Sequence, residues 1–341
     1  MSSQKLKKTA HVDDAALNLI IILIVASLLL IVVSTVYFAA TRLASATPEG
    51  DGPENLPAGS NADYPFNVHI DVPVFNTDDA LTISDTISSE HAIIVDVTDN
   101  KVLASRLSKQ MIYPASMTKV MTLIVAVENL KTEASLDDVI TISKPQGDHS
   151  GYGLKVGEKL TVKDLLYVAI LQSDGIACLE LADYIAGSEA NFVKLMNDKA
   201  AELGISSSTL FQNCSGLHHQ YQYTTVYDMS VIMSYAMKNP LCASVLTSLS
   251  YKPSENFRPG EGCTFWHKLL HNLLDDGNKN PKNATLLGGK TGFTEKDTSG
   301  YCIVSYAKGN NGHFYVTVTA KAEGWMANVD DILYIFNNHV K

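Results

Sequence analysis

The sequence predicts an α+β body, in which an antiparallel sheet is flanked by helices and joined to a helical lobe, preceded by one transmembrane helix. Three observations predict this fold class. A β-hairpin pattern occupies residues 91–107, a block of apolar and amphipathic helical patterns follows, and strand patterns return between residues 285 and 320. Because strands and helices come in separate runs, an α+β arrangement is expected.

The bulk composition bounds the class of protein. The chain has 341 residues, a formal net charge of −10 and 46% hydrophobic residues, enough for one large or two modest globular domains behind the N-terminal segment. The acidic balance, together with the lack of a basic cluster interleaved with aromatic residues, argues against a nucleic-acid partner. Five widely spaced cysteines without a C-x-x-C pair are expected to be small buried hydrophobes, although one bridged pair stays open if the domain is exported.

The N-terminus predicts a membrane anchor. Residues 1–14 contain lysines and are expected to stay in the cytoplasm, whereas the uncharged run 15–40 exceeds the roughly 20 residues that span a bilayer. Small residues at 44–46 resemble a cleavage site, so a cleaved and secreted form is the alternative. Residues 41–66, rich in Pro, Gly, Ser, Asn and acids, cannot bury a core and are expected to form a flexible linker. Residues 67–341 are the predicted extracytoplasmic body.

The body is expected to begin with a hairpin whose strands, 91–97 and 102–107, are joined by a turn at Asp99-Asn100. The glycine-containing stretch 143–156 resembles a phosphate loop only superficially. No helix beginning with Lys-Ser or Lys-Thr follows it, so it is interpreted as a plain turn.

The pattern 165–186 is helical on both sides of the tripeptide Ser173-Asp174-Gly175, whose residues are costly inside a helix. Either two helices meet there at a tight turn, or the break presents Ser173 to a cleft. Two further helices are expected at 191–203 and 228–237.

The C-terminal third predicts strands and a closing helix. His267 and His271 lie four residues apart, a spacing that can bind a metal. No glutamate base or third ligand accompanies them, so no metal is assigned. Strands are expected within 285–294, 301–307 and 314–320, and a helix over 329–336.

The most informative local pattern is Ser116-x-x-Lys119, followed by an apolar run to Val127. The chain is expected to arrive extended at Pro114 and to turn into a core helix near Ser116, with Lys119 one turn later on the same side. The positive field at a helix N-terminus favours a developing alkoxide. A lysine can act as general base if burial or a second cation lowers its pKa. The pattern therefore indicates a serine nucleophile with a lysine partner.

The Ser-x-x-Lys pattern alone is weak, because it also occurs at Ser2, before the membrane segment, and at Ser305, inside a predicted strand. Neither of those serines begins a helix. The alternative interpretation of Ser116 is an N-cap serine on a core helix, without any chemistry.

A second and rarer pattern is Lys-Thr-Gly at 290–292, on a predicted strand beside glycines. Ser116-x-x-Lys119, a serine in a helix break at Ser173 and Lys-Thr-Gly on a strand, in this order, resemble the motif set of serine penicillin-recognising enzymes. From about residue 89 onward the chain is similar to low-molecular-mass D-alanyl-D-alanine carboxypeptidases, which implies a serine β-lactamase or penicillin-binding transpeptidase-like fold. Further matching stretches lie at 113–119, 181–188, 292–294 and 299–302.

The resemblance implies a role for each motif residue. Ser116 would attack the carbonyl between the two terminal D-alanines of a peptidoglycan stem peptide, and Lys119 would take its proton. Ser173 would relay a proton to the leaving D-alanine, and Lys290 would be the second cation that lowers the pKa of Lys119. Backbone N–H groups of Ser116 and Phe293 would form the oxyanion hole. The implied substrate-binding residues are Lys290, Thr291, Gly292, Phe293 and Thr294.

The resemblance also implies the setting. The protein would be a single-pass protein of the bacterial cytoplasmic membrane, with its catalytic domain outside, acting on cell-wall peptidoglycan without a cofactor or metal. β-Lactam antibiotics would be covalent inhibitors. Members of the family often continue into a β-rich domain and an amphipathic C-terminal anchor, whereas this sequence carries its predicted anchor at the front.

One motif departs from the family's pattern. The second motif is usually Ser-x-Asn, and the asparagine would bond Lys119 and the substrate amide, but this chain has Gly175 in its place. Asp174 or a water are the two substitutes left open. Loss of one such hydrogen bond costs on the order of 1–3 kcal/mol, roughly ten- to hundredfold in rate.

This departure keeps three functions in competition. The first is an active serine D-Ala-D-Ala carboxypeptidase. The second is a catalytically weak or inactive wall-binding protein of the same fold. The third is a β-lactamase, because Ser173-Asp174 matches the start of that group's Ser-Asp-Asn, although no clear Glu-x-x-x-Asn signature lies between the second and third motifs.

Overall fold

The computed structural model describes residues 70–275 and 280–341. The predicted cytoplasmic tail, transmembrane helix and linker, residues 1–66, therefore lie outside the part of the chain that is described. Within the described part, no helix combines the length and the apolar character needed to cross a bilayer.

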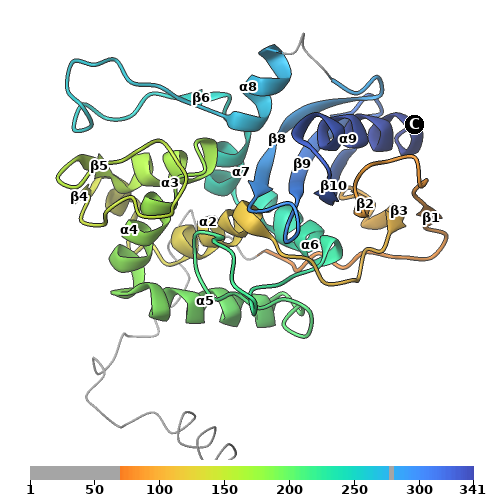
Figure 1. The fold of residues 1–341 in the computed structure, drawn as a ribbon, viewed down its shortest axis with the longest axis horizontal. Helices are drawn as coiled ribbons and strands as arrows, with labels where there is room; N and C mark the ends of the chain where they lie inside the picture. The colour runs from red at the N-terminus through yellow and green to blue at the C-terminus, as the bar shows by residue number, and fades with distance from the viewer. Residues whose placement is uncertain (1–69, 276–279) are drawn as a thin grey trace, which may run out of the picture. The chain divides into compact units, whose positions relative to one another are not determined.

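A six-stranded sheet forms the centre of the body, with the strand order β1-β3-β2-β10-β9-β8 (Figure 1). All neighbours in it are antiparallel except β1, which pairs in parallel with β3. The predicted antiparallel sheet is thus confirmed except at this edge, where β1 and β2 lie on either side of β3. The strands are β1 (Leu81–Thr82), β2 (His91–Asp96), β3 (Lys101–Arg106), β8 (Ala284–Phe293), β9 (Tyr301–Gly309) and β10 (Phe314–Ala322).

The two faces of the sheet belong to two separate hydrophobic cores. In β2 the side chains of Ile93 and Val95 join the larger core, which includes the helical lobe. Ala92 and Ile94 point the other way into the smaller core, as the period-2 alternation of a strand requires. Every residue of β2 is buried, and between His91 and Asp96 its sequence is an uninterrupted apolar run, as expected for a strand covered on both faces.

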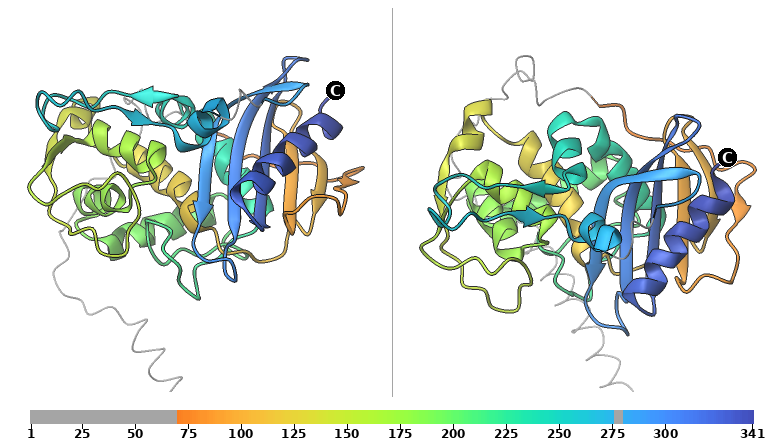
Figure 2. Two further views of the ribbon diagram at one scale, coloured as in Figure 1. Left: turned by 45° about the horizontal axis from the view of Figure 1, so that its top comes forward. Right: turned by 90° about the horizontal axis from the view of Figure 1, so that it is seen from above.

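Helices cover both faces (Figure 2). Helices α8 (Lys268–Asp275) and α9 (Trp325–His339) supply the smaller core. The larger core takes in α6 (Val226–Lys238), which packs across β2 and β10. The remaining helices of the lobe are α2 (Thr118–Glu128), α3 (Val162–Leu171), α4 (Gly175–Ala186), α5 (Glu189–Glu202) and α7 (Pro240–Thr247).

Local capping signals account for the helix starts. Thr161 and Asp164 form a capping box at the start of α3, and Ser188 and Thr225 cap α5 and α6. Neither α7 nor α8 was predicted from the sequence, although Asn239 caps α7 and Pro240 occupies its first turn. The other helices and the three C-terminal strands are confirmed, with ends shifted by a few residues.

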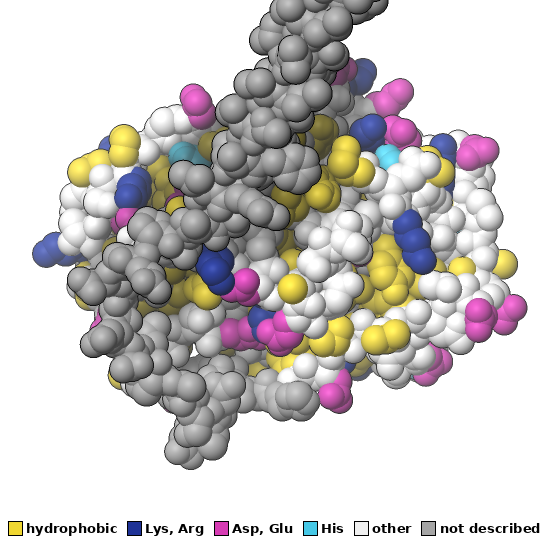
Figure 3. Space-filling model, turned by 90° about the horizontal axis from the view of Figure 1, so that it is seen from below, with side chains coloured by type: hydrophobic (Ala, Val, Ile, Leu, Met, Phe, Trp, Pro, Cys, Tyr) yellow, Lys and Arg dark blue, Asp and Glu magenta, His cyan; other side chains and the backbone are white. Residues whose placement is uncertain are grey.

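Short elements complete the body. They are the 3₁₀ turns η1 (Ala115–Met117) and η2 (Glu133–Asp137), and two small hairpins formed by β4 (Val139–Thr141) with β5 (Lys159–Thr161) and by β6 (Ser250–Tyr251) with β7 (Phe265–Trp266). All five cysteines are free, and all except Cys263 are buried, as predicted for small hydrophobic side chains. On the described part of the face in Figure 3, acidic and basic side chains are interspersed rather than gathered by sign.

Candidate active site

The first motif places a serine and a lysine in direct contact. Lys119 Nζ lies 3.0 Å from Ser116 Oγ and donates a hydrogen bond to it, and it also donates to the carbonyl of Ser215. Ser116 is half-buried and lies in η1, one turn before Lys119 in α2. No side-chain oxygen caps either η1 or α2. The Ser116 hydroxyl is therefore bonded to the lysine rather than used as an N-cap.

The second motif lies at the junction of α3 and α4. Ser173 has a φ of 58°, a left-handed conformation that is costly for a serine, and its Oγ accepts a hydrogen bond of 2.9 Å from Lys290 Nζ. Both sequence interpretations of the break are correct, since two helices meet there and the turn presents Ser173 to a pocket.

Asp174 is a structural residue. Its fully buried carboxylate accepts hydrogen bonds from the backbone N–H groups of Ala177, at 2.9 Å, and Tyr152, at 2.8 Å. These bonds cap α4 and hold the loop before it. A carboxylate engaged in this way does not supply the hydrogen-bond donor that an asparagine amide offers, which excludes one of the two substitutes considered for Gly175.

A bulge in β8 turns the third motif toward the first two. The pairing of β8 with β9 shifts between Leu286, opposite Ala307, and Gly288, opposite Tyr306. Leu286 faces the smaller core, whereas Lys290, opposite Val304, faces the lobe. Without the extra residue, the side-chain alternation would direct Lys290 to the opposite face of the sheet.

A glycine lets the third motif approach the nucleophile. A Cβ on Gly292 would lie 2.6 Å from Cys302 Sγ and 3.1 Å from the carbonyl oxygen of Pro114. The end of β8 therefore packs directly against the turn that carries Ser116 (Figure 1). A side chain at position 292 would displace the Cys302 thiol and crowd the Pro114 carbonyl, so glycine suits this close approach.

Burial dominates the electrostatics of the site. Lys119 and Lys290 are each 2% exposed. Burial lowers the pKa of Lys119, and nearby Cys178 and Asp174 oppose that effect. Burial also lowers the pKa of Lys290, and the charges of Lys119 and Lys268 add to the effect. The prediction that Lys290, as a second cation, lowers the pKa of Lys119 is thus wrong. Burial lowers the pKa of Lys119, and the charge effect runs the other way, from Lys119 to Lys290.

Two adjoining pockets meet at Ser116. One has a volume of about 420 Å³ and is lined by Lys119, Phe293 and Thr294. The other has a volume of about 290 Å³ and is lined by Ser173, Thr291 and Gly292 in addition to Ser116 and Phe293. The predicted substrate-binding residues 291–294 therefore border these pockets, and Lys290 reaches them through its bond to Ser173. Thr294 Oγ1 lies 2.8 Å from both Thr298 Oγ1 and Ser299 Oγ.

Three residues on the pocket walls were missed from the sequence. Lys268, at the start of α8, lines the smaller pocket, and His149 lines the larger. Ser150 lines both. Lys268 stands between the two histidines that were weighed as metal ligands, and His149 lies in the stretch interpreted as a plain turn. No spacing motif marks either residue, because each reaches the pocket through the tertiary fold.

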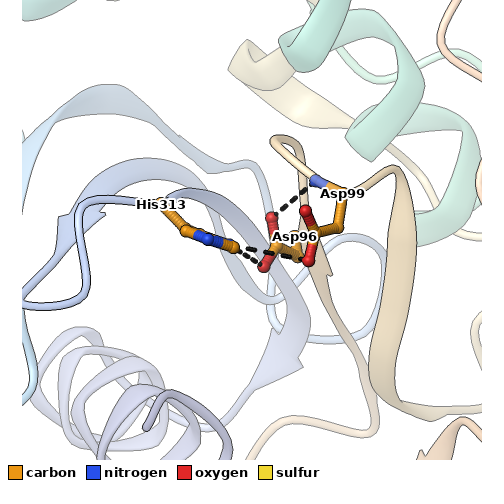
Figure 4. A group of neighbouring side chains, drawn as sticks. All are labelled: Asp96, Asp99 and His313. Atoms are coloured by element: carbon orange, nitrogen blue, oxygen red, sulfur yellow. Dashed lines mark hydrogen bonds and ion pairs between the residues drawn. The ribbon is translucent and has the colours of Figure 1, made fainter.

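The one cluster with metal-ligand chemistry found among residues 70–275 and 280–341 is Asp96, Asp99 and His313 (Figure 4). Asp96 Oδ1 accepts hydrogen bonds from the N–H groups of Thr98 and Asp99, and its Oδ2 lies 2.8 Å from His313 Nδ1. The carboxylate thus ties the β2–β3 turn to the β9–β10 turn, at the end of the sheet opposite the motif residues. His267, weighed earlier as a ligand, is buried, and its Nε2 lies 3.2 Å from the carbonyl oxygen of Leu246.

Comparisons with known proteins agree with this geometry. A family model described as D-alanyl-D-alanine carboxypeptidase matches residues 78–323. The carboxypeptidase DacF of Bacillus subtilis is 30% identical over 226 residues, which are 65% of this chain and 55% of that protein. DacC of Escherichia coli is 38% identical over 149 residues, 41% of this chain and 37% of that protein. The chain spans about half the length, or less, of these curated relatives.

The fold is also that of a solved relative. The D-alanyl-D-alanine carboxypeptidase from Mycobacterium tuberculosis has 25% sequence identity and superposes with a TM-score of 0.64, covering 77% of this chain and 96% of that chain. This confirms the penicillin-binding transpeptidase-like fold expected from the sequence.

Proposed function

Since the chain belongs to the D-alanyl-D-alanine carboxypeptidase family, we propose that it is a serine carboxypeptidase that removes the terminal D-alanine from peptidoglycan stem peptides. The observation that carries the proposal is a single cluster of four side chains. Ser116 Oγ lies 3.0 Å from Lys119 Nζ, and Ser173 Oγ lies 2.9 Å from Lys290 Nζ, where the two pockets adjoin.

Acylation begins at Ser116. The neutral Lys119 amine accepts the hydroxyl proton as Ser116 Oγ forms a bond with the carbonyl carbon between the two D-alanines. Burial favours this neutral amine because it lowers the pKa of Lys119. The backbone N–H groups of Ser116 and Phe293 stabilise the oxyanion. The C–N bond then breaks, and Ser173 relays the proton that Lys119 took from Ser116 to the departing amine of D-alanine, which leaves Lys119 neutral again.

Substrate binding uses the opposite wall. Lys290, Thr291 and Thr294 hold the free carboxylate of the terminal D-alanine through charge and hydroxyl groups. Lys268, beside the smaller pocket, adds positive charge to the same region. Water then hydrolyses the ester on Ser116 and releases the shortened peptide. β-Lactams, which present a strained amide to the same serine, acylate it as covalent inhibitors.

The proposed cellular setting is the outer side of the bacterial cytoplasmic membrane. The lysine-containing residues 1–14 and the uncharged run 15–40 support a single-pass anchor with the N-terminus inside. Residues 41–66 then tether the domain 67–341 near the wall. A cleaved, secreted form is the alternative, and the size of the mature protein in membrane and medium fractions separates the two.

The decisive experiment measures D-alanine release from a tripeptide ending in D-Ala-D-Ala by the purified full-length protein and its Ser116→Ala variant. We expect release that disappears in the variant. No release from the folded protein would favour the wall-binding alternative that Gly175 motivates. Rapid hydrolysis of nitrocefin with weak D-alanine release would favour a β-lactamase.

A further inference from the structure

A histidine from a distant loop covers the glycine of the second motif. A Cβ built on Gly175 would lie 2.7 Å from His149 Nδ1 and 2.9 Å from His149 Cβ. Real Cβ atoms do not approach other atoms so closely, so the imidazole occupies the space into which a side chain at position 175 would project. The His149 imidazole can therefore lie here only because residue 175 has no side chain.

The loop that carries His149 is held in place on both sides. Before it, the buried carboxylate of Glu180 in α4 accepts hydrogen bonds from the N–H groups of Ser143, at 2.6 Å, and Lys144, at 2.8 Å. After it, Gly175 N–H donates to the carbonyl of Ser150 at 2.9 Å, and Tyr152 N–H donates to Asp174.

The histidine backbone itself is bonded within this loop. His149 N–H donates to the carbonyl of Gln146 at 3.1 Å, and the Gln146 amide donates back to the carbonyl of His149. The backbone that carries the imidazole is thus held by the loop itself.

The imidazole offers the same kinds of polar group as the asparagine that the family usually has at position 175. His149 lines the larger pocket with Ser116 and Lys119. Its Nδ1 is buried against Gly175 and has no hydrogen-bond partner among the described residues, so Nε2 is the nitrogen that a substrate in the pocket can reach. Burial lowers its pKa and the charge of Lys119 adds to this, against Glu189, Asp174 and Asp148. A neutral imidazole has one donor and one acceptor nitrogen, and an asparagine amide likewise offers both kinds of group.

We propose that His149 is a substrate-binding residue of this active site, taking the place of the second-motif asparagine and hydrogen-bonding the substrate amide beside Ser116. The inference rests on the proposed carboxypeptidase function. It explains how a chain with Gly175 retains a complete set of polar groups around its nucleophile, and it makes glycine at position 175 a requirement for seating the imidazole.

The test exchanges the two side chains. The full-length protein is compared with His149→Ala, Gly175→Asn and the double variant, by the rate of Ser116 acylation with a fluorescent penicillin and by D-alanine release. We expect both rates to fall by about ten- to hundredfold in each single variant. His149→Ala loses a hydrogen bond to the substrate, and in Gly175→Asn the new side chain collides with the imidazole. The double variant should recover at least about tenfold over either.

Controls separate function from folding. His313→Ala, at the far end of the sheet, should match the wild type in rate, and thermal melting should show that each variant is folded. His149→Gln, which keeps an amide on the same loop, should acylate faster than His149→Ala. Protonation of Lys119 should lower the rate at acid pH in both proteins, and His149→Gln should lose only the additional fall that protonation of the imidazole causes in the wild type.

Two outcomes overturn the proposal. One is a folded His149→Ala protein with the wild-type rate, and the other is a folded double variant no faster than the slower single variant. A wild-type protein that penicillin acylates but that releases no D-alanine removes the carboxypeptidase function, while the acylation rates still decide the role of His149. A wild-type protein without either activity removes both proposals.

Discussion

Lys290 Nζ donates a hydrogen bond to Ser173 Oγ across 2.9 Å, which joins a strand of the sheet to the turn between two helices of the lobe. Lys290 is also bonded to the carbonyl of Thr291, at 2.8 Å, and is 2% exposed. Burial of a lysine amine costs folding free energy, whatever its function. We therefore expect Lys290 to reduce the stability of the fold while being needed for activity.

Replacing Lys290 should separate these two properties. In Lys290→Met the buried amine is lost, so we expect acylation by a fluorescent penicillin to fall by about 10²- to 10³-fold, while the free energy of unfolding stays equal or rises. The exposed Lys282 provides a matched control, since Lys282→Met should change neither quantity. A Lys290→Met protein that keeps its acylation rate would contradict the role assigned to this amine.

The acylation rate should depend on pH through Lys119. Its pKa is lowered from 10.5 mainly by burial, and the neutral amine is the base, so the rate should rise with pH and level off below pH 10.5. In Lys119→Arg the guanidinium stays charged, so acylation should be abolished and the rise of its rate with pH should disappear. A pH–rate profile for penicillin acylation measures this, and a wild-type rate that falls with pH over the same range would refute it.

Gly216 should be essential for the geometry of the nucleophile. Its φ is +81°, and a Cβ there would collide with the carbonyl of Ala115 and lie 3.0 Å from Ser116 Cα. Gly204, with a φ of +72°, has nothing within 4 Å of a built Cβ. Gly204→Ala should therefore lose about 1–2 kcal/mol of stability with normal acylation, whereas Gly216→Ala should also lose at least about tenfold in acylation rate.

Chemical denaturation and acylation rates of the two glycine variants make this comparison. Since the backbone cost is shared, the excess effect at Gly216 reports the collision. Equal acylation rates in the two variants would mean that the turn around Ser116 adjusts without consequence.

His267 should make the fold sensitive to acid. Burial, with the charge of Lys290, lowers its pKa from 6.5 to about 4. The neutral form is therefore the folded form, and between these two values the unfolded state binds a proton that the folded state does not. Stability present above pH 6.5 should be lost as pH falls toward 4, by up to about 3 kcal/mol.

The difference in unfolding free energy between wild type and His267→Gln, measured by denaturant titration from pH 7 to 4, isolates this contribution. It should shrink as the pH falls. The exposed His219, replaced in the same way, serves as the control. If the difference in unfolding free energy stayed constant from pH 7 to 4, His267 would have the same pKa in the folded and unfolded states.

Local sequence was sufficient for the first motif. Ser116 and Lys119 are three residues apart, so one helical turn brings them together whatever the rest of the fold does. The break at Ser173 was equally visible, because Asp174 and Gly175 interrupt an apolar helical pattern. The hairpin, the three C-terminal strands and the helices over 191–203 and 228–237 also followed from periodicity, which depends only on neighbouring residues.

What only the tertiary structure decided is the relation between segments distant in the chain. The bulge at Leu287, which directs Lys290 toward Ser173, has no periodic signal, because one extra residue in a strand looks like an ordinary alternation. Lys268 reaches the pocket from between two histidines to which no metal was assigned, and His149 reaches it from a stretch interpreted as a plain turn. Their positions depend on long-range hydrogen bonds, such as those from the His149 loop to Glu180 and Asp174. Sequence spacing reports short-range geometry, and a pocket is assembled from contacts that spacing does not encode.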